Sequence, residues 1–195
     1  MAAPAKINYK VYQGSTFNEV LRWESSTKVY APITGISKTA PMVVTAVAHN
    51  APKGWRTKIT GVLGMKEANT SEYVTCTDTT TDMLTYNSIN ALGFTTYTSG
   101  GVVEYNQPID LTGFTARMQL RTKLDDVSFI KELTTENGGI ILDNTLKTIK
   151  LYISAADTSE SEFSSALYSV ELISSGGEVT AFITGTLSLV KEVTR

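Results

Sequence analysis

Apolar and polar residues alternate with a period of two over residues 114–121 of this chain. The apolar positions are Phe114, Ala116, Met118 and Leu120, and the polar positions are Thr115, Arg117, Gln119 and Arg121. Successive side chains of a β-strand point to opposite faces of its sheet. The segment therefore predicts a strand with one face in a core and the other in solvent. Residues 149–153 and 168–172 repeat the pattern, so we expect several such strands.

Turn-forming residues divide much of the remaining chain into short segments. Between residues 31 and 107, proline and glycine punctuation predicts strands at 42–48, 55–60, 72–77, 83–87 and 101–106. Two more strands are expected on either side of Gln13-Gly14-Ser15. Residues 154–160 start with a serine and two alanines, which predicts one short helical turn. The 29 threonines and 17 serines, 46 of 195 residues, also favour strands and turns over long helices.

The charge balance disfavours two classes of partner. Lys and Arg number 17 and Asp and Glu 19, so the formal net charge is −2 and the sequence pI is about 5.5. A basic surface that could neutralise phosphates is not expected, and we predict no nucleic-acid partner. No apolar run approaches the roughly 18 residues that a membrane helix needs, and we predict no membrane partner. The N-terminal residues lack the apolar segment of a signal peptide, so synthesis in a reducing cytoplasm is expected.

Few residues are suited to catalysis. His49 is the single histidine and precedes the turn Pro52-Lys53-Gly54, so we predict a structural role in that turn. Cys76 is the single cysteine and has no Lys, Arg or His adjacent in sequence to activate it, so we predict a small core residue.

Three carboxylate pairs have the residue types of acid–base or calcium sites: Asp78 with Asp82, Asp125 with Asp126, and Glu160 with Glu162. None has the ligand density of a calcium loop, and each is surrounded by residues typical of solvated turns. We therefore predict no catalytic residue, no metal site and no cofactor.

Four residues are candidates for contacts with a partner protein. Trp55 and Tyr97 have aromatic side chains of the kind that anchor interfaces, although core or half-buried strand positions are the favoured alternative for both. Arg117 and Arg121 lie on the solvent face of the alternating strand at residues 114–121. Charge reversal at these two arginines is expected to weaken docking more than changes at Lys66 or Glu67.

Four stretches of the chain carry a resemblance to a known group of proteins. They include Gln13-Gly14-Ser15-Thr16-Phe17, Asp110-Leu111-Thr112-Gly113, Asn137-Gly138-Gly139 and Tyr168-Ser169-Val170-Glu171-Leu172. Together they resemble small structural proteins of tailed bacteriophages, and related patterns begin the baseplate proteins that dock fibres onto the tail. In that family the first strand pair runs almost directly into the Asp-Leu-Thr-Gly segment, whereas residues 30–107 intervene here. The resemblance therefore implies a sandwich that is split in sequence.

The intervening segment has a resemblance of its own. It is carried by Ile33-Thr34-Gly35-Ile36, Pro41-Met42-Val43-Val44-Thr45, Ile59-Thr60-Gly61-Val62-Leu63-Gly64-Met65 and the residues 93–101. These look like a small β-module of phage fibre and tail proteins, which is similar to the first catalytic cysteine half-domain of ubiquitin-activating enzymes. The reactive cysteine of those enzymes belongs to the other half-domain, so Cys76 is not its counterpart.

The resemblances imply an all-β fold: an immunoglobulin-like Greek-key β-sandwich with an inserted small β-barrel-like domain. The expected ranges are 1–30 and 107–195 for the sandwich, which would be the docking platform, and 31–106 for the insert. The implied function is that of a non-enzymatic structural protein of a tailed-phage virion, an adaptor or collar subunit of the tail, baseplate or neck. Its partners would be other virion proteins and copies of itself in a ring. The alternative is a receptor- or carbohydrate-binding tail-fibre module. We expect synthesis in the host bacterial cytoplasm and residence in the virion.

Overall fold

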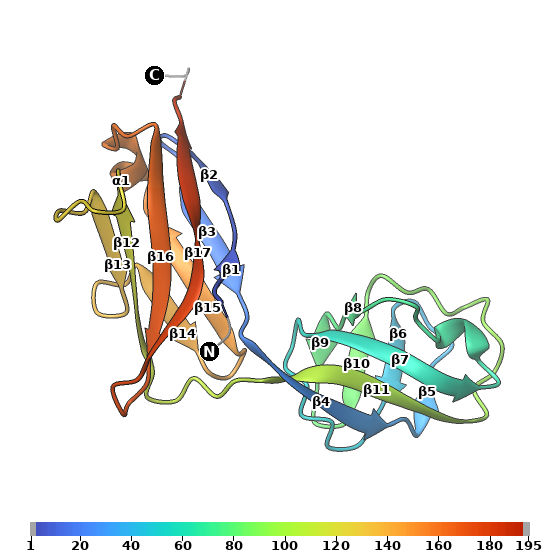
Figure 1. The fold of residues 1–195 in the computed structure, drawn as a ribbon. Coiled ribbons are helices and arrows are strands. Elements are labelled where there is room, and N and C mark those ends of the chain that lie inside the picture. The colour runs from blue at the N-terminus through green and yellow to red at the C-terminus, as the bar shows by residue number, and fades with distance from the viewer. Residues whose placement is uncertain (1–2, 193–195) are drawn as a thin grey trace. The chain divides into compact units, whose positions relative to one another are not determined.

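The computed structural model describes residues 3–192, and strands account for most of its regular structure (Figure 1). The chain divides into two compact units. Unit 1 contains residues 3–22, 110–144 and 148–192, and unit 2 contains residues 23–109 and 145–147. The sequence-based boundaries after residues 30 and 106 fall inside β4 (Glu24–Pro32) and β11 (Ser99–Pro108), which pair with each other in unit 2. The prediction of an all-β chain is confirmed.

Unit 1 consists of two sheets. The larger has the order β1-β17-β16-β12-β13, with β2 also paired to β17. Its strands are β1 (Ala5–Lys6), β2 (Tyr9–Tyr12), β12 (Thr115–Arg121), β13 (Lys131–Thr134), β16 (Ser165–Ile173) and β17 (Val179–Val190). The smaller has the order β14-β15-β3, with β3 (Phe17–Leu21), β14 (Ile140–Asp143) and β15 (Thr148–Ile153). β1 and β2 run parallel to β17, and the other described pairs are antiparallel.

The alternating segments line the core of unit 1, as predicted. Ala116, Met118 and Leu120 of β12 are buried, and the polar residues between them lie on the outer face. β15 and β16 bury alternate residues in the same way. The ring of Tyr9 on β2 meets the ring of Phe17 on β3 edge-on, with 5.4 Å between the centroids. The core therefore lies between the inner faces of the two sheets.

The predicted short helical turn forms as α1 (Ala155–Ser159). Ser154 caps it, because its Oγ accepts a hydrogen bond of 3.1 Å from the backbone N–H of Asp157. Thr158 is buried, and its Oγ1 donates to the Ser15 carbonyl at 2.8 Å. The helix thereby holds the turn between β2 and β3. No helix among the described residues is long and apolar enough to cross a membrane.

Replacing Thr158 by Val should lower the free energy of unfolding of unit 1 by about 1–2 kcal/mol. Valine keeps the shape but removes the hydroxyl, so the Ser15 carbonyl loses a donor at a partly buried position. Denaturant unfolding measures the change, and hydrogen exchange should show faster exchange at residues 15–17. Thr158→Ser keeps the donor and is the control. Equal losses for the two variants would contradict the role assigned to this hydrogen bond.

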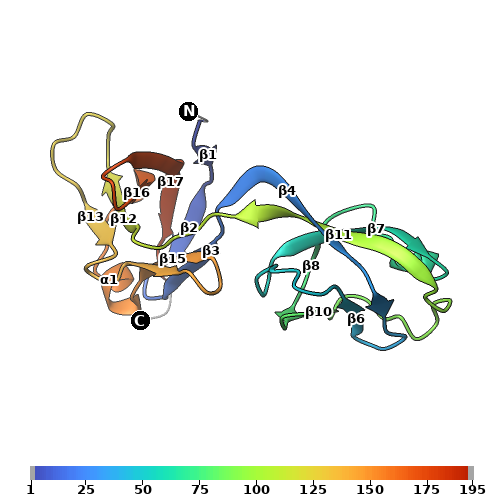
Figure 2. The same ribbon diagram turned by 90° about the horizontal axis from the view of Figure 1, so that it is seen from below.

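Unit 2 consists of two four-stranded sheets (Figure 2). One has the order β4-β11-β7-β8, with β7 (Arg56–Leu63) and β8 (Val74–Thr75) beside the two long strands already named. The other has the order β5-β6-β10-β9, with β5 (Gly35–Ile36), β6 (Met42–Thr45), β9 (Asp78–Thr79) and β10 (Met83–Tyr86). A single 3₁₀ turn, η1 (Lys66–Ala68), follows β7. The strand predictions for residues 31–107 thus match elements in type and place, with shifted ends.

Bulky side chains fill the core of unit 2, and their polar atoms are satisfied. Trp55 and Tyr86 are fully buried within a cluster that also contains Met42, Ile59 and Cys76. The Tyr86 hydroxyl makes a hydrogen bond of 2.8 Å with Thr57 Oγ1. The indole Nε1 of Trp55 donates to the Asn106 carbonyl at 2.8 Å. This pairing is what allows aromatic residues with polar groups to be buried completely.

The expected barrel-like shape of the insert is not found, because no sheet among residues 3–192 closes on itself. β8 and β9 have two residues each and are separated by Cys76 and Thr77. At this bend the Cys76 N–H donates to the carbonyl of Trp55, directly before β7, and the Thr77 N–H donates to the carbonyl of Thr85 on β10. The chain thus passes between the sheets without an unbroken ladder joining them.

Candidate interaction surfaces

His49 has the structural role that the sequence predicted. Its side chain is buried, its Nδ1 accepts from the Ala51 N–H at 3.0 Å, and its Nε2 lies 3.2 Å from the Met83 carbonyl. Since Nδ1 accepts, Nε2 must carry the proton and donate, which fixes the neutral tautomer. Ala48 and Asn50, on either side, have φ of 50° and 54°. His49 therefore holds a tight turn through both ring nitrogens.

Cys76 is fully buried in the core of unit 2, as predicted. Its thiol lies 3.5 Å from the Pro52 carbonyl, to which it donates. The contact fixes the side chain against the turn that contains Lys53 and Gly54. A buried sulfur in this position packs as a small apolar group.

The three carboxylate pairs are separate surface features. Asp78 makes an ion pair of 3.2 Å with Lys53, and the Asp82 carboxylate accepts from the Ala48 N–H at 2.9 Å. Asp126 accepts from the Lys123 N–H at 2.8 Å. Glu160 and Glu162 follow α1 in the loop that leads to β16. Among the residues that the structure describes, no group of three His, Cys, Asp or Glu side chains could hold a metal ion.

The side chains of the two aromatic contact candidates pack within unit 2. Trp55 is fully buried, so its ring cannot stack on a sugar or anchor a partner. Its proposed role as a partner contact is therefore wrong. Tyr97 is partly buried against the same core, and its hydroxyl donates at 3.0 Å to the carbonyls of Ile33 and Gly100. Both residues follow the core alternative that the sequence left open. Their side chains form hydrogen bonds with residues of other strands and loops. The sequence around Trp55 and Tyr97 gives no sign of these partners.

The two arginine candidates lie on the outer face of β12, but they differ in their contacts. Arg117 is half exposed and pairs with Glu171 of β16 at 2.7 Å. Arg121 donates to the carbonyl oxygens of Asp126 and Ser128 and to Gln119 Oε1. Arg121 therefore shapes the loop between β12 and β13, so reversing its charge would alter that loop as well as the surface.

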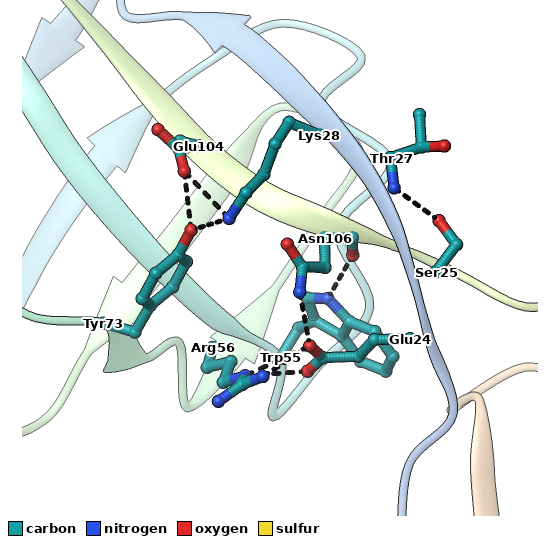
Figure 3. A network of polar contacts seen from close by, with 9 residues as sticks. All are labelled: Glu24, Ser25, Thr27, Lys28, Trp55, Arg56, Tyr73, Glu104 and Asn106. Carbon is teal, nitrogen blue, oxygen red and sulfur yellow. Dashed lines mark hydrogen bonds and ion pairs between the residues drawn. The ribbon is translucent and has the colours of Figure 1, made fainter. Parts of the chain in front are cut away.

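A polar network covers the outer face of the β4-β11-β7-β8 sheet (Figure 3). In one half of it, Arg56 makes a bidentate contact with Glu24, with its NH2 group 2.7 Å from Oε2 and its Nε 2.9 Å from Oε1. Asn106 donates to the same carboxylate at 2.9 Å. The backbone carbonyl of Asn106 accepts the hydrogen bond from the Trp55 indole. This half therefore links the first residue of β4 to β7, to β11 and to the core beneath.

In the other half of the network, Glu104 on β11 accepts from the Tyr73 hydroxyl at 2.6 Å and lies 3.0 Å from Lys28 Nζ on β4. Lys28 also donates to the Tyr73 hydroxyl, and its Nζ lies 4.6 Å from the centre of that ring. The hydrogen bond from Tyr73, followed by that from Lys28, holds the pKa of Glu104 below its ordinary value of 4.5. The hydrogen bond of Lys28 to Tyr73, followed by that to Glu104, raises the pKa of Lys28 above its ordinary value.

The network joins cations to carboxylates across strands that are distant in sequence. Lys28 and Arg56 each contact a carboxylate within the unit, so they offer little unpaired charge to an anion. The arrangement stiffens the sheet and presents a polar surface of mixed charge. Sequence reasoning missed it. The outward positions of Lys28 and Glu104 could be inferred from alternation, but the pairing of β4 with β11 has no local signal.

Acid should weaken unit 2 through Glu104. Because its pKa is lowered in the folded state, its contribution to stability is present above the ordinary value of 4.5 and is lost as pH falls through the folded pKa. We expect Glu104→Gln to reduce stability at neutral pH and to flatten its decline between about pH 5 and 3. Denaturant unfolding across this range measures both effects. Glu72→Gln, at an exposed carboxylate without an ion pair to a described residue, is the control. Parallel profiles for the wild type and Glu104→Gln would rule the explanation out.

A second exposed feature is the loop of residues 122–130 between β12 and β13, which projects from the sheet of unit 1 (Figure 2). Leu124 and Val127 in it are 82% and 97% exposed, and Phe129 and Ile130 are also exposed. Four large apolar side chains are thus presented to solvent within seven residues. Exposed apolar groups at this density mark surfaces that bind another molecule.

We compared the chain with protein-family models and with curated proteins. It matches no family model and no curated protein.

Proposed function

We propose that the protein is a non-enzymatic structural component of a tailed-bacteriophage virion, an adaptor or collar subunit of the tail, baseplate or neck. It would be made in the host bacterial cytoplasm and incorporated into the particle in several copies. The function is binding: unit 1 docks onto other virion proteins, and unit 2 meets fibres or neighbouring subunits. No catalytic residue, metal or cofactor enters this proposal.

The observation that carries the proposal is the place of the four phage-like stretches in the fold. The stretches are 13–23, 109–121, 133–140 and 168–172, which are far apart in the sequence, yet every residue of them except Trp23 and Ile109, at the boundary with unit 2, belongs to unit 1. They supply β3, all of β12 and the centre of β16, together with the turn before β14. Segments that recur together in one protein family are expected to build one structural unit, and these do so.

The turns of the phage-like stretches are fixed by side chains of those same stretches. Asp110 Oδ1 accepts from the N–H and the hydroxyl of Thr112, an Asx turn at the start of the Asp-Leu-Thr-Gly segment. Asn137 Oδ1 accepts at 2.9 Å from the N–H groups of Thr134 and Gly139. These side chains therefore stabilise the local backbone of the two turns. Their recurrence is therefore consistent with a shared fold.

The finer fold that we propose is an immunoglobulin-like Greek-key sandwich for unit 1, with unit 2 inserted into it. Support comes from the chain path, which leaves unit 1 after residue 22 and returns at residue 110. Further support comes from the two sheets of unit 1, which combine N-terminal strands with C-terminal ones. The stretches that resemble the ubiquitin-activating-like module of phage fibre and tail proteins fall in unit 2.

Detection of the chain in purified phage particles tests the proposal. Particles of the phage that encodes the protein would be banded on a density gradient, and their proteins would be quantified by mass spectrometry against the major tail and capsid proteins. We expect several copies of the chain per particle. Electron microscopy of particles labelled with an antibody against the chain would then place it at the tail, baseplate or neck. Complete absence from gradient-purified particles would refute a virion role.

A further inference from the structure

The loop of residues 122–130 is held in a defined shape by its own hydrogen bonds. The Arg121 guanidinium donates to two of its carbonyl groups, and the Ile130 N–H donates to the Leu120 carbonyl at 2.7 Å. The Asp126 carboxylate closes the turn by accepting from the Lys123 N–H. A loop ordered in this way loses little conformational entropy when it binds, so its apolar side chains are preorganised for docking.

A hollow lies directly beside this loop on the outer face of the β12-β16-β17 part of the sheet. Its volume is about 160 Å³, and its walls combine the polar residues Gln119, Arg121 and Ser169 with Leu124, Leu167 and Tyr168. Leu124 thus belongs both to the apolar loop and to the wall of the hollow. The protruding group and the cavity that could receive it are neighbours on one surface of unit 1. Such a surface is self-complementary, because two copies related by a two-fold axis can each insert a loop into the other.

The charges of the loop are self-complementary in the same sense. Lys123 and Asp125, on either side of Leu124, are exposed and make no ion pair with another described residue. When two such segments meet antiparallel with Leu124 at the centre, Lys123 of each copy lies opposite Asp125 of the other. Opposite charges in this register favour the contact, whereas a parallel alignment would place like charges together.

We propose that the loop of residues 122–130 and the adjacent hollow form a two-fold homodimer interface, whose occupant is the same surface of a second copy of this chain. The inference does not depend on the virion proposal, since it concerns two copies in solution. One loop and one hollow per copy form a small interface, below the roughly 1,200 Å² of stable complexes, so the dimer is weak. Dimer formation would bury Leu124 and Val127.

Sedimentation velocity of the full chain over about 10 µM to 1 mM tests the proposal, a range that suits interfaces of this size. The wild type should shift from monomer to dimer within it. Leu124→Ser with Val127→Ser should raise the dissociation constant at least about tenfold, because two apolar side chains leave the interface. Val47→Ser with Leu92→Ser, at residues of unit 2 that are 62% and 63% exposed, is the matched control and should dimerise like the wild type. A wild type that stays monomeric throughout overturns the proposal, as does equal weakening by the control.

A charge-reversal pair tests the register independently of the apolar contacts. Lys123→Asp puts a negative charge at both residue 123 and residue 125, and Asp125→Lys puts a positive charge at both positions, so neither variant should dimerise alone. An equimolar mixture should form a heterodimer, and the double variant with both changes should recover the wild-type dissociation constant. Thermal unfolding that matches the wild type confirms that the variants are folded. Failure of the mixture to associate while the wild type dimerises would overturn this antiparallel register.

Discussion

Trp55→Ala should unfold unit 2 more readily than any other single change considered for this protein. The side chain is fully buried at the centre of the core of unit 2, and its indole is hydrogen-bonded to Asn106. Truncation leaves a cavity and removes a donor, with an expected loss of about 3–5 kcal/mol. Domains of this size commonly have only about 5–15 kcal/mol in total. Hydrogen exchange followed by mass spectrometry should therefore show greatly reduced protection in residues 29–105.

Two controls separate the causes of that loss. Trp55→Phe keeps an aromatic ring but removes the Nε1 donor, and it should cost clearly less than the alanine variant. Leu92→Ala removes an exposed apolar side chain of the same unit and should change stability by less than about 0.5 kcal/mol. A Trp55→Ala protein with wild-type protection in unit 2 would show that the buried position assigned to this ring is incorrect.

Gly185→Ala should have the largest effect in unit 1, because a backbone group occupies the space of the added methyl group. A Cβ atom at Gly185 would lie 1.7 Å from the carbonyl oxygen of Ile7. That carbonyl accepts from the Tyr168 hydroxyl at 2.8 Å, and the Ile7 N–H donates to Thr184 at 2.9 Å. The clash should detach residues 5–8 from β17 and lower stability by about 3 kcal/mol.

Loss of hydrogen-exchange protection at residues 5–8, together with denaturant unfolding, measures this effect. Gly176→Ala is the matched control, since the nearest atom to its added Cβ is Ser174 Oγ at an ordinary contact distance of 3.7 Å. The control should stay within about 0.5 kcal/mol of the wild type. If both alanine variants behave alike, the close approach of the N-terminal segment to β17 cannot be what requires glycine at residue 185.

Several features of the fold could be predicted because they depend on residues close together in sequence. Alternation placed Met118 in the core, a serine before two alanines marked the cap of α1, and the absence of neighbouring charges identified Cys76 as a packing residue. Each of these signals lies within a few residues of its effect. Strand ends were less certain because hydrogen bonding to a neighbouring strand decides where a strand stops.

The features that could not be predicted depend on which distant segments pair. The network of Lys28, Tyr73 and Glu104 exists only because β4 pairs with β11, β11 with β7, and β7 with β8, which Tyr73 directly precedes. The same holds for the boundary between the units, which depends on assigning all of β4 to unit 2.

The sequence by itself determined that the chain is built of strands, which faces of those strands are apolar, and that His49 and Cys76 serve the fold. Only the tertiary structure decided that Trp55 is buried, that Arg121 shapes a loop, and that Leu124 and Val127 are exposed. The physical reason is that periodicity is a local property of the chain. The burial of a particular side chain is fixed by what packs over it, and in a sheet protein the covering residues come from distant parts of the sequence.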